Sequence, residues 1–553
     1  MSRKRIEVRG MTCEHCALSV EAVLEDAGAT GVFVDYRRGF AEFDPEGVDL
    51  ERAREFVRGA GYELGEPLPI EGDGSPEQVE DLRSGGADEF EYDLAIVGAG
   101  AAAFAAAIQA FERGARVVMV EHGTVGGTCV NVGCVPSKAM LRAGEIYNLA
   151  GRNPHRGAPT STGPVELGEL VAQKDALVER MRQEKYCNLI EEYGWELVKG
   201  HAEFADAETL LVDERPLRAR RYLIASGARP AIPPIEGLEE AGYVTSTSGL
   251  ELKQLPKRLL VVGGNYIGLE MGQLYAHLGS EVVLFEMLER ISPLEEPEVA
   301  ETLAAILESE GVRLVTGARV IRAGREGGQK TLTVLVDGEE QVFQGDEILI
   351  AAGRRPNTDK LGVERAGIEL DERGAVRTDE TQRTTNPRVY AAGDCTASPQ
   401  FVYVAAAQGA TAARNALTDG EERLDYTALP RVTFTHPQVA AVGLTETQAQ
   451  EAGLEVEART LPLEAVPRAA VNLDTRGFVK LVAEREGGRI VGATAVAENA
   501  GDLILAAVYA VQFKLTTDDV AKTWAPYLTM SEGFKLAAQI FTRDVSKLSC
   551  CAA

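Results

Sequence analysis

The sequence has no excess of positive charge. Its 57 Lys and Arg residues are outnumbered by 85 Asp and Glu residues, which leaves a formal net charge of −28 over 553 residues. Nucleic-acid binding needs a basic surface that neutralises phosphates, so we expect no nucleic-acid partner. A long apolar run is also missing. Residues 94–111 are uncharged, but Gly98, Gly100 and the β-branched residues before them favour a strand–turn–helix over a membrane span.

The N-terminal residues MSRKRIEVRG are charged, and no apolar segment follows them. We therefore expect no secretory signal, no stable membrane insertion and a cytoplasmic protein. In that compartment, paired cysteines are more often redox groups or metal ligands than structural disulfides. The eight cysteines include three pairs: Cys13 with Cys16, Cys129 with Cys134, and Cys550 with Cys551. Adjacent thiols such as the last pair are poorly suited to a disulfide and well suited to a soft metal ion.

Periodicity indicates several domains. Residues 1–66 alternate strand-like and helical stretches in the order βαββαβ, which predicts a small ferredoxin-like domain. Residues 67–90 have the proline, glycine and acidic composition of a flexible linker. A strand, a glycine turn and a helix then begin near residue 91 and again near residue 257. This repetition predicts an α/β fold with two Rossmann-like dinucleotide-binding domains.

The first glycine turn has the spacing of a dinucleotide-binding motif. Gly98 permits the tight turn, Gly100 lets a pyrophosphate approach the backbone, and the small Ala103 lets the helix lie close to the strand. The N-terminus of that helix then faces the phosphates. Glu121 ends the next strand, where its carboxylate can bind a ribose hydroxyl.

The second turn is less regular. Gly263 and Gly268 fit the motif, but Asn265 stands where the second glycine belongs. Glu286 takes the position that Glu121 has in the first unit. A carboxylate there accepts hydrogen bonds from a free ribose and repels a 2′-phosphate, which favours NADH. Arg290 could still serve a phosphate, so NADPH remains open.

Cys129 and Cys134 lie in GGTCVNVGCVPSK, directly after the acidic end of the first unit's second strand. We expect a helix to begin within the four residues between them, and a helix N-terminus lowers the pKa of a nearby thiol. Beside a flavin, this placement is typical of a redox-active disulfide rather than of a structural crosslink.

These motifs, together with ASGARP at 225–230 and YAAGDC at 390–395, resemble the flavin-dependent disulfide oxidoreductases over about residues 91–548. The resemblance implies FAD, NADPH or NADH, and a homodimer whose active sites are shared between subunits. It also implies the domain boundaries. They are 91–236 and 354–425 for the FAD-binding domain, 237–353 for the NAD(P)H-binding domain, and 426–553 for an α+β dimerisation domain that carries the terminal cysteine pair.

The resemblance also assigns residue roles by motif position. Asp394 would contact the ribityl chain of FAD, and Lys138 and Glu270 would lie near the flavin ring. Tyr266 would act as a gate over the nicotinamide pocket. Of the redox cysteines, Cys134 would lie against the flavin, and Cys129 would be the outer thiol that exchanges with the substrate.

The chain departs from the thiol-reducing members of this family near its C-terminus. Those members carry a proton-shuttling histidine in a pattern like HPTxSE. In WAPYLTMSEG here, Glu532 keeps its spacing but Tyr527 occupies the histidine's place. Without that base, reduction of an organic disulfide should be slow. Tyr527, Tyr186 in EKYCNL and the terminal cysteines instead resemble the branch of the family that reduces Hg(II) to Hg(0).

That resemblance implies a route for Hg(II), which would arrive as a thiol complex. The ion would pass by ligand exchange from Cys550 and Cys551 of one subunit to the redox pair of the other, where Tyr186 and Tyr527 line the inner site. GMTCEHC at 10–16 resembles a heavy-metal-associated domain, a motif found more often with Cu(I) than with Hg(II). Cys13 and Cys16 would therefore bind the metal first and deliver it through the tether.

Two alternatives remain open. A thiol-disulfide reductase such as a dihydrolipoamide dehydrogenase, with a metal-binding appendage, fits the nucleotide motifs. A nonenzymatic copper-binding module fits GMTCEHC alone. Cys187 and Cys395 have no partner in the sequence and are expected to be buried as small hydrophobic residues.

Overall fold

The structure is a computed structural model. It describes residues 4–9, 20, 23–24, 27–35, 40–44, 48, 50, 52–54, 63–65, 68–69 and 90–544. The chain divides into two compact units, Met1–Ala87 and Asp88–Ala553. In the part of the chain that the structure describes, no helix is both long and apolar enough to cross a bilayer.

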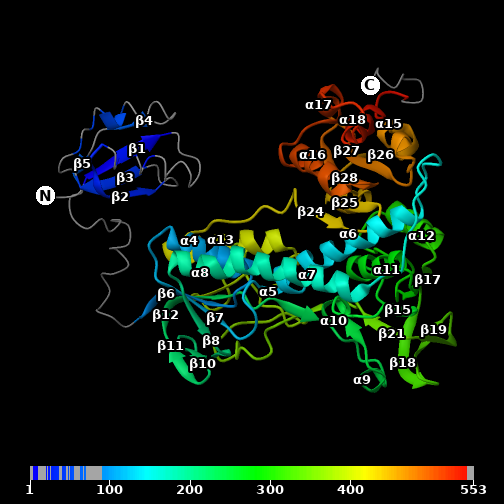
Figure 1. Ribbon diagram of the computed structural model, residues 1–553, viewed down its shortest axis with the longest axis horizontal. Helices are drawn as coiled ribbons and strands as arrows, with labels where there is room; N and C mark the ends of the chain where they lie inside the picture. The colour runs from blue at the N-terminus through cyan, green and yellow to red at the C-terminus, as the bar shows by residue number, and fades with distance from the viewer. Residues whose placement is uncertain are drawn as a thin grey trace. The chain divides into compact units, whose positions relative to one another are not determined.

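The described part of the first unit is an antiparallel sheet (Figure 1). Its strands are β1 (Lys4–Arg9), β2 (Thr30–Asp35), β3 (Phe40–Asp44), β4 (Glu63–Leu64) and β5 (Leu68–Pro69). The order β2-β3-β1-β4 is that of a βαββαβ fold. Alternate residues of β1 and β3, such as Ile6 and Phe43, are fully buried in its core.

The structure differs from the sequence analysis at the end of this unit. Leu68 and Pro69 were expected to begin a flexible linker, but they form strand β5 and pair with Lys4 and Arg5 of β1. Cys13 and Cys16 lie outside the described residues.

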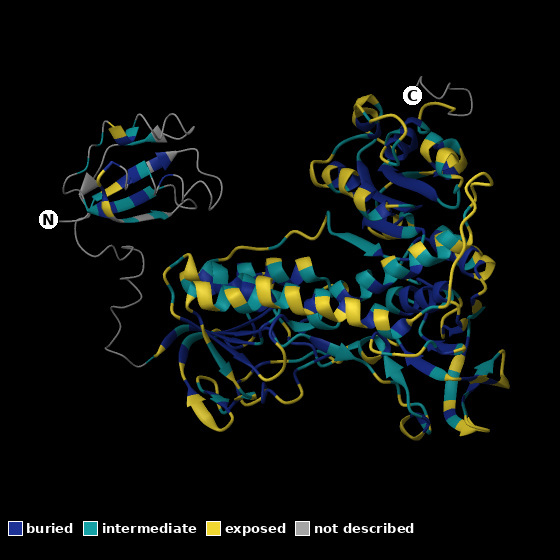
Figure 2. Ribbon diagram, viewed as in Figure 1, coloured by how far each residue is buried: buried dark blue, intermediate teal, exposed yellow. Residues whose placement is uncertain are grey.

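The second unit begins with a parallel sheet of Rossmann type (Figure 1). Its strands are β6 (Tyr92–Val97), β7 (Val117–Glu121), β8 (Glu196–Lys199), β12 (Ala219–Ile224) and β23 (Val389–Ala391). They lie in the order β23-β12-β6-β7-β8, so the chain reverses direction across the sheet between β6 and β12. Ligands bind at such a switch point, beyond the carboxyl ends of the strands. All five residues of β7 are buried, and Figure 2 shows the inner strands of this sheet in dark blue, which fits a sheet covered on both faces.

The helices of this part of the chain carry the motifs found in the sequence. They are α4 (Ala101–Phe111), α5 (Gly127–Asn131), α6 (Cys134–Gly151), α7 (Leu167–Arg182), α8 (Asn188–Tyr193) and α13 (Val402–Thr418). Alanine dominates α4, and a Cβ added at Gly409 of α13 would come within 2.0 Å of the Ala102 carbonyl oxygen. These small residues let α4 and α13 pack closely against each other. A small antiparallel sheet also lies here, formed by β9 (Ala202–Phe204), β10 (Leu210–Val212) and β11 (Arg215–Leu217).

A second parallel sheet repeats the arrangement. Its strands are β14 (Val244–Thr245), β15 (Arg258–Val262), β16 (Glu281–Phe285), β17 (Arg313–Val315) and β21 (Glu347–Ile350), in the order β14-β21-β15-β16-β17. The accompanying helices are α11 (Tyr266–Leu278) and α12 (Pro297–Ser309), and a three-stranded sheet is formed by β18 (Arg319–Glu326), β19 (Gln329–Val336) and β20 (Glu339–Gly345). Strands β13 (Ala228–Pro230) and β22 (Arg354–Pro356) form a separate antiparallel pair.

The last part of the chain is an antiparallel sheet with helices. Its strands are β24 (Pro430–Thr433), β25 (Gln438–Gly443), β26 (Val456–Pro462), β27 (Phe478–Glu484) and β28 (Ile490–Ala497). The helices are α14 (Glu446–Glu451), α15 (Pro467–Asn472), α16 (Ala500–Gln512), α17 (Thr517–Lys522) and α18 (Glu532–Gln539). The predicted architecture of two Rossmann-like domains and an α+β domain is confirmed.

Candidate active site

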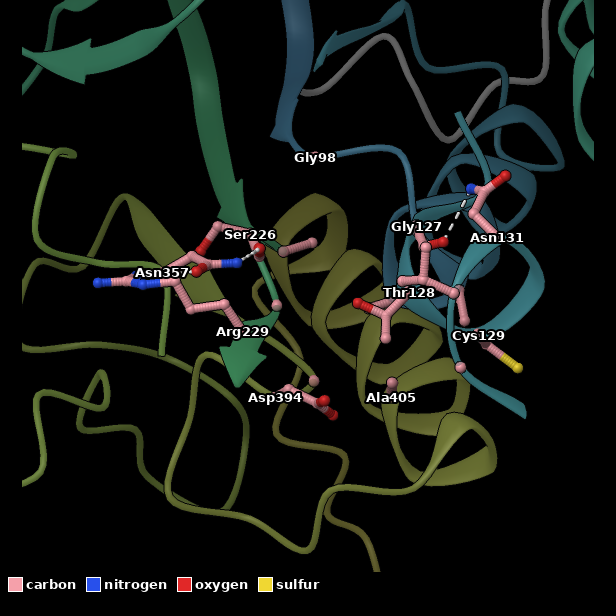
Figure 3. A pocket seen from close by; sticks show the side chains of 18 of the residues that line it. Gly98, Gly127, Thr128, Cys129, Asn131, Ser226, Arg229, Asn357, Asp394 and Ala405 are labelled. Carbon is pink, nitrogen blue, oxygen red and sulfur yellow. Dashed lines mark hydrogen bonds between the residues drawn. The ribbon is translucent and has the colours of Figure 1, made fainter. Parts of the chain in front are cut away.

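A cavity of about 880 Å³ opens at the switch point of the first parallel sheet (Figure 3). It brings together residues that are far apart in the sequence. Those predicted from motifs that line it are Gly98, Gly100, Glu121, Cys129, Cys134, Lys138, Tyr266, Glu270 and Asp394. One cavity therefore joins the first nucleotide motif to the cysteine pair.

The glycine turn forms one wall of the cavity. Gly98 has a φ of +117°, and a Cβ there would lie 2.4 Å from the carbonyl oxygen of Ala225 at the end of β12. Only glycine fits this conformation and this approach. Gly100 is the N-cap of α4, and a Cβ on it would meet nothing closer than Gly127 Cα at 3.6 Å. The N-terminus of α4 is therefore accessible to a phosphate, and Ala103 is fully buried behind it.

Glu121, the last residue of β7, lines one end of this cavity. Its carboxylate accepts hydrogen bonds from the backbone N–H groups of Ala99, at 2.9 Å, and Gly123, at 2.6 Å. These bonds fix the carboxylate at the end of β7, next to the glycine turn, and each oxygen keeps acceptor capacity for a ligand hydroxyl.

Asp394 approaches the cavity from the loop after β23. Burial raises the pKa of its carboxyl group, and Arg354 Nε lies 3.6 Å from Oδ2. On the same side, the side-chain amide of Asn357 donates a hydrogen bond of 3.0 Å to the carbonyl oxygen of Ser226 (Figure 3). This bond ties the loop after β12 to the segment that follows β22.

The lining suits FAD. Glu121 lies where the ribose of a dinucleotide would bind, and the N-terminus of α4 beside it would face the pyrophosphate. The cysteine pair further along the cavity would lie next to the redox-active ring. The glycine turn leaves the room that a pyrophosphate needs against the backbone. These residues would hold the adenosine and pyrophosphate parts of FAD, with its ring toward Cys134 and Lys138.

Cys129 lies in α5 and Cys134 is the first residue of α6. Both are free thiols, and Cys134 is exposed to the cavity. A hydrogen bond from Cys129 lowers the pKa of Cys134 to about 7, with a further contribution from the positive charge of Lys138. The same hydrogen bond, together with burial, raises the pKa of Cys129. The pair therefore holds one thiolate, on Cys134, and one proton, on Cys129, near neutral pH.

Lys138 is positioned by an ion pair. Its Nζ lies 2.8 Å from Oε2 of Glu270 on α11 and 4.5 Å from the centre of the Phe434 ring. The other oxygen of Glu270 accepts the backbone N–H of Phe434 at 2.8 Å. Phe434 was not predicted from the sequence, because nothing in FTHPQ signals a contact with a lysine some 300 residues earlier.

Replacing Lys138 by Met should raise the pKa of Cys134 by about one pH unit, because a stabilising positive charge is lost. Replacing Glu270 by Gln should lower that pKa, because the negative charge of Glu270 raises it. The rate of thiol alkylation against pH measures both changes. Shifts in the same direction in both variants would contradict the electrostatic assignment.

Hydrogen bonds of Asn131, which lies between the two cysteines, connect this segment to α7. The side-chain amide of Asn131 donates to the carbonyl oxygen of Gly127 at 2.8 Å (Figure 3) and to that of Val125 at 2.9 Å. Its Oδ1 accepts a hydrogen bond of 3.0 Å from Arg182, the last residue of α7. The sequence analysis did not single out Asn131 or Arg182, since their roles depend on a contact between separate helices.

Tyr186 lies in the π-helical turn η1 (Gln183–Cys187) that follows α7. Its ring packs edge to face on Phe104, with ring centroids 4.9 Å apart. Burial, and then the negative charge held by the Cys129–Cys134 pair, raise the pKa of its phenol. Tyr186 therefore lies near the cysteine pair, and its phenol stays protonated and can donate a hydrogen bond. Tyr403, at the start of α13, was not predicted, and burial raises its pKa to about 12 with a contribution from Cys134.

The other predicted residues lie elsewhere. Tyr527 is half-exposed in the loop between α17 and α18 and is not part of the cavity lining. Cys550 and Cys551 lie outside the described residues. Cys395 is buried, as expected, whereas Cys187 is only partly buried.

The second nucleotide turn repeats the first. Gly263 has a φ of +114°, and a Cβ there would lie 2.4 Å from the carbonyl oxygen of Ala351. A Cβ on Gly268 would lie 1.8 Å from the Gly263 carbonyl oxygen, so the close approach of α11 to this turn requires glycine. Asn265, which replaces the second glycine of the motif, is the N-cap of α11, and its side chain accepts a hydrogen bond from Tyr266 N. Tyr266 reaches the cavity from the first turn of α11.

Comparison with known families matches most of the second unit. Residues 92–409 match the pyridine nucleotide-disulphide oxidoreductases, and residues 429–538 match the dimerisation domain of the same family. The chain is also similar to the flavoprotein disulfide reductase RclA of Escherichia coli, with a TM-score of 0.74 and 29% identity over 81% of this chain and 100% of that one. LpdA of Mycobacterium tuberculosis gives a TM-score of 0.74 and 28% identity, over 81% and 99% of the two chains.

Three bacterial enzymes are similar over more of the sequence. The chain is 49% identical to a mercuric reductase of Staphylococcus aureus over 548 residues, which is 99% of each chain. It is 48% identical to a mercuric reductase of Lysinibacillus sphaericus over 553 residues, all of each chain. A mercuric reductase of Streptomyces lividans is 52% identical over 471 residues, covering 83% of this chain and 98% of that one.

Proposed function

The chain belongs to the pyridine nucleotide-disulphide oxidoreductase family, and we propose that it reduces Hg(II) to Hg(0) with NAD(P)H through FAD and a cysteine pair. The observation that carries this proposal is the Cys129–Cys134 pair. Its thiolate lies beside Lys138, close to the protonated phenol of Tyr186, in a chain that resembles mercuric reductases over its whole length.

Each part of the cavity has a task in this proposal. FAD, when bound, accepts a hydride from NAD(P)H and supplies an electron pair at the thiols. The turn at Gly98 and Gly100 binds its pyrophosphate and Glu121 its ribose. Asp394 binds the ribityl chain. Lys138 and Glu270 hold the ring in place, and Tyr266 covers the nicotinamide pocket.

The cysteines bind the substrate by ligand exchange, because Hg(II) is soft and prefers sulfur. The proton of Cys129 first passes across the hydrogen bond to Cys134, and the Cys129 thiolate then attacks, forming an Hg–S bond as one outgoing thiolate leaves. That outgoing thiolate takes the proton from Cys134. The Cys134 thiolate then displaces the second outgoing thiolate, and Tyr186 donates its O–H toward the sulfurs during the exchange. Two electrons release Hg(0) and return both cysteines as thiolates. Overall, Hg(SR)₂ and NAD(P)H give Hg(0), NAD(P)⁺, two thiolates and one proton.

The ion reaches this pair from other cysteines. Cys13 and Cys16 capture Hg(II) from small-molecule thiols and pass it to Cys550 and Cys551, which deliver it to the redox pair of the partner subunit past Tyr527. Each transfer exchanges one thiolate for another, so the free ion is never released. The working compartment is the cytoplasm, where these thiols stay reduced.

A homodimer supports this transfer between subunits. Helix α16 carries the exposed side chains of Leu505 and Tyr509, and Phe513 follows at the same spacing. These residues share one helix face, and the Tyr509 and Phe513 rings stack with centroids 6.3 Å apart. Trp524 in the same domain is 97% exposed. A dimer interface would cover such apolar surface.

Release of Hg(0) tests the function directly. Purified FAD-loaded protein, given NAD(P)H and Hg(II) with excess thiol under anaerobic conditions, should consume the nucleotide and volatilise mercury in equal amounts. Lipoamide or glutathione disulfide in place of Hg(II) should give little turnover, because Tyr527 replaces the histidine base. Nucleotide oxidation without mercury vapour would refute the proposal.

Deleting residues 1–89 should leave a folded, FAD-containing enzyme, because the compact unit that holds the cavity begins at Asp88. With excess thiol, kcat should stay within about twofold of the full chain, since the tethered unit only raises the local concentration of metal. At low thiol the full chain should be faster. A product without FAD would contradict the boundary, and an FAD-containing product without activity would contradict the auxiliary role.

A further inference from the structure

The carboxylate of Glu286 is held at the second nucleotide turn in the same way as that of Glu121 at the first. Glu286 accepts the backbone N–H of Gly264 at 2.6 Å and that of Leu288 at 2.9 Å. Glu121 accepts the corresponding N–H groups of Ala99 and Gly123. In both units the carboxylate therefore joins the glycine turn to the residue two positions beyond itself.

The Glu286 side chain is buried and packs closely against the glycine turn. It is 9% exposed, and a Cβ on Gly264 would lie 2.8 Å from Glu286 Cβ and 3.0 Å from its Oε2. The buried side chain of Ile291 is on the same side, 3.1 Å from that Cβ position. The negative charge is thus fixed where the adenosine ribose of a nicotinamide nucleotide binds in a Rossmann domain, with acceptor capacity left on each oxygen.

The residues that follow Glu286 supply no free positive charge. Met287, Leu288 and Glu289 are exposed, and none of them is basic. Arg290 is the basic residue that could serve a 2′-phosphate. Its Nη2 donates to the carbonyl oxygens of Pro293 and Glu295, at 3.1 and 3.2 Å. Its positive charge also contributes to lowering the pKa of Glu298 in α12, so the guanidinium is directed toward that helix.

We propose that the chain is specific for NADH and that Glu286 is the residue that excludes NADPH. This inference rests on the proposed use of a nicotinamide nucleotide as electron donor. The ribose hydroxyls of NADH donate hydrogen bonds to the fixed carboxylate. A 2′-phosphate would instead place a doubly charged anion against it, and Arg290, the basic residue among 287–290, donates to the carbonyl oxygens of Pro293 and Glu295.

The test uses the full-length, FAD-loaded protein without mercury. Anaerobic reduction of the bound flavin, followed by its absorbance, should give a kcat/KM at least about tenfold higher with NADH than with NADPH. Calorimetric titration with NAD⁺ and NADP⁺, which involves no turnover, should show the same order of affinity. Equal values for the two nucleotides, or a preference for the phosphorylated one, would overturn the inference.

Two variants assign the preference to one side chain. Glu286→Gln keeps the shape and removes the charge, so the NADH-to-NADPH ratio should fall at least about fivefold, mainly through a gain with NADPH. Glu289→Gln removes the same charge from an exposed neighbour, and its ratio should stay within about twofold of the wild type. A similar fall in both variants, or none in Glu286→Gln, would show that the contact with Glu286 does not set the preference. The wild-type ratio decides on NADH even if Glu286→Gln does not fold.

Failure of this inference can be told apart from failure of the proposed function. If NADH reduces the flavin faster than NADPH does but no Hg(0) is released, the proposed reaction is wrong and the inferred nucleotide preference stands. If Hg(0) is released at the same rate with NADPH as with NADH, the proposed reaction stands and the inferred nucleotide preference is wrong.

Discussion

Replacing Cys134 by Ser should lower the rate of Hg(0) release at least about a thousandfold, because the residue loses both its thiolate and its affinity for a soft metal. Cys134 is the cysteine that carries the negative charge near neutral pH, and its side chain is exposed to the cavity beside Lys138. A serine hydroxyl stays protonated there and cannot displace a thiolate from Hg(II). Mercury vapour measured with NAD(P)H and excess thiol is the readout.

The same variant should still bind FAD and should still be reduced by NAD(P)H. The glycine turn and Glu121 make their hydrogen bonds within the first nucleotide unit and do not involve Cys134. Cys187→Ala is the matched control, because it removes a partly buried thiol without touching the pair, and its rate should stay within about twofold of the wild type. Normal mercury release from Cys134→Ser would exclude the pair as the site of reduction.

Replacing Cys550 and Cys551 together by Ala should lower turnover of thiol-bound Hg(II) by at least about a hundredfold, while reduction of bound FAD by NAD(P)H continues at its normal rate. The reason is kinetic. Without a thiolate pair to exchange with, Hg(II) complexes reach the redox pair only by direct encounter. The matched control is Cys13→Ala with Cys16→Ala, which removes the same number of thiols from the other end of the chain and should cost little in excess thiol.

Mixing two inactive variants tests whether the sites are shared between subunits. A Cys134→Ser subunit supplies an intact terminal pair, and a subunit lacking Cys550 and Cys551 supplies an intact redox pair. Random reassociation should restore about a quarter of the wild-type rate, because half of the dimers are mixed and each has one complete site of two. No recovery, in dimers shown to have exchanged, would place both pairs of a working site on one subunit.

Much of the fold follows from local sequence. The β-branched residues before Gly98 form a buried parallel strand, and the glycine at its end adopts the positive φ that the turn into α4 requires. The same pattern at Gly263 predicts the second Rossmann unit. Such signals are readable because they are confined to about thirty consecutive residues. The end of the first unit was misread, because Leu68 and Pro69 belong to a strand only through their pairing with β1.

The candidate site was predictable in part. Nucleotide motifs and cysteine spacing indicated Cys129, Cys134 and Glu121 because each lies in a pattern with a chemical reason for its spacing. Phe434 and Arg182 lie in no such pattern. They reach the site because β24 and α7 come next to α6 and α5 in the folded chain, and Tyr403 does so through the start of α13.

The amino-acid sequence by itself predicted the reaction class, from three cysteine pairs, two nucleotide turns, and Tyr527 at the position where a disulfide reductase has a histidine. Tertiary structure decided which thiol carries the charge and how Glu286 is held at the second nucleotide turn. The thiolate of Cys134 depends on a hydrogen bond and on a lysine whose place is set by Glu270. The charge at the second turn depends on two backbone N–H groups that fix Glu286. Both outcomes are electrostatic, and electrostatic effects depend on distances that only the folded chain sets.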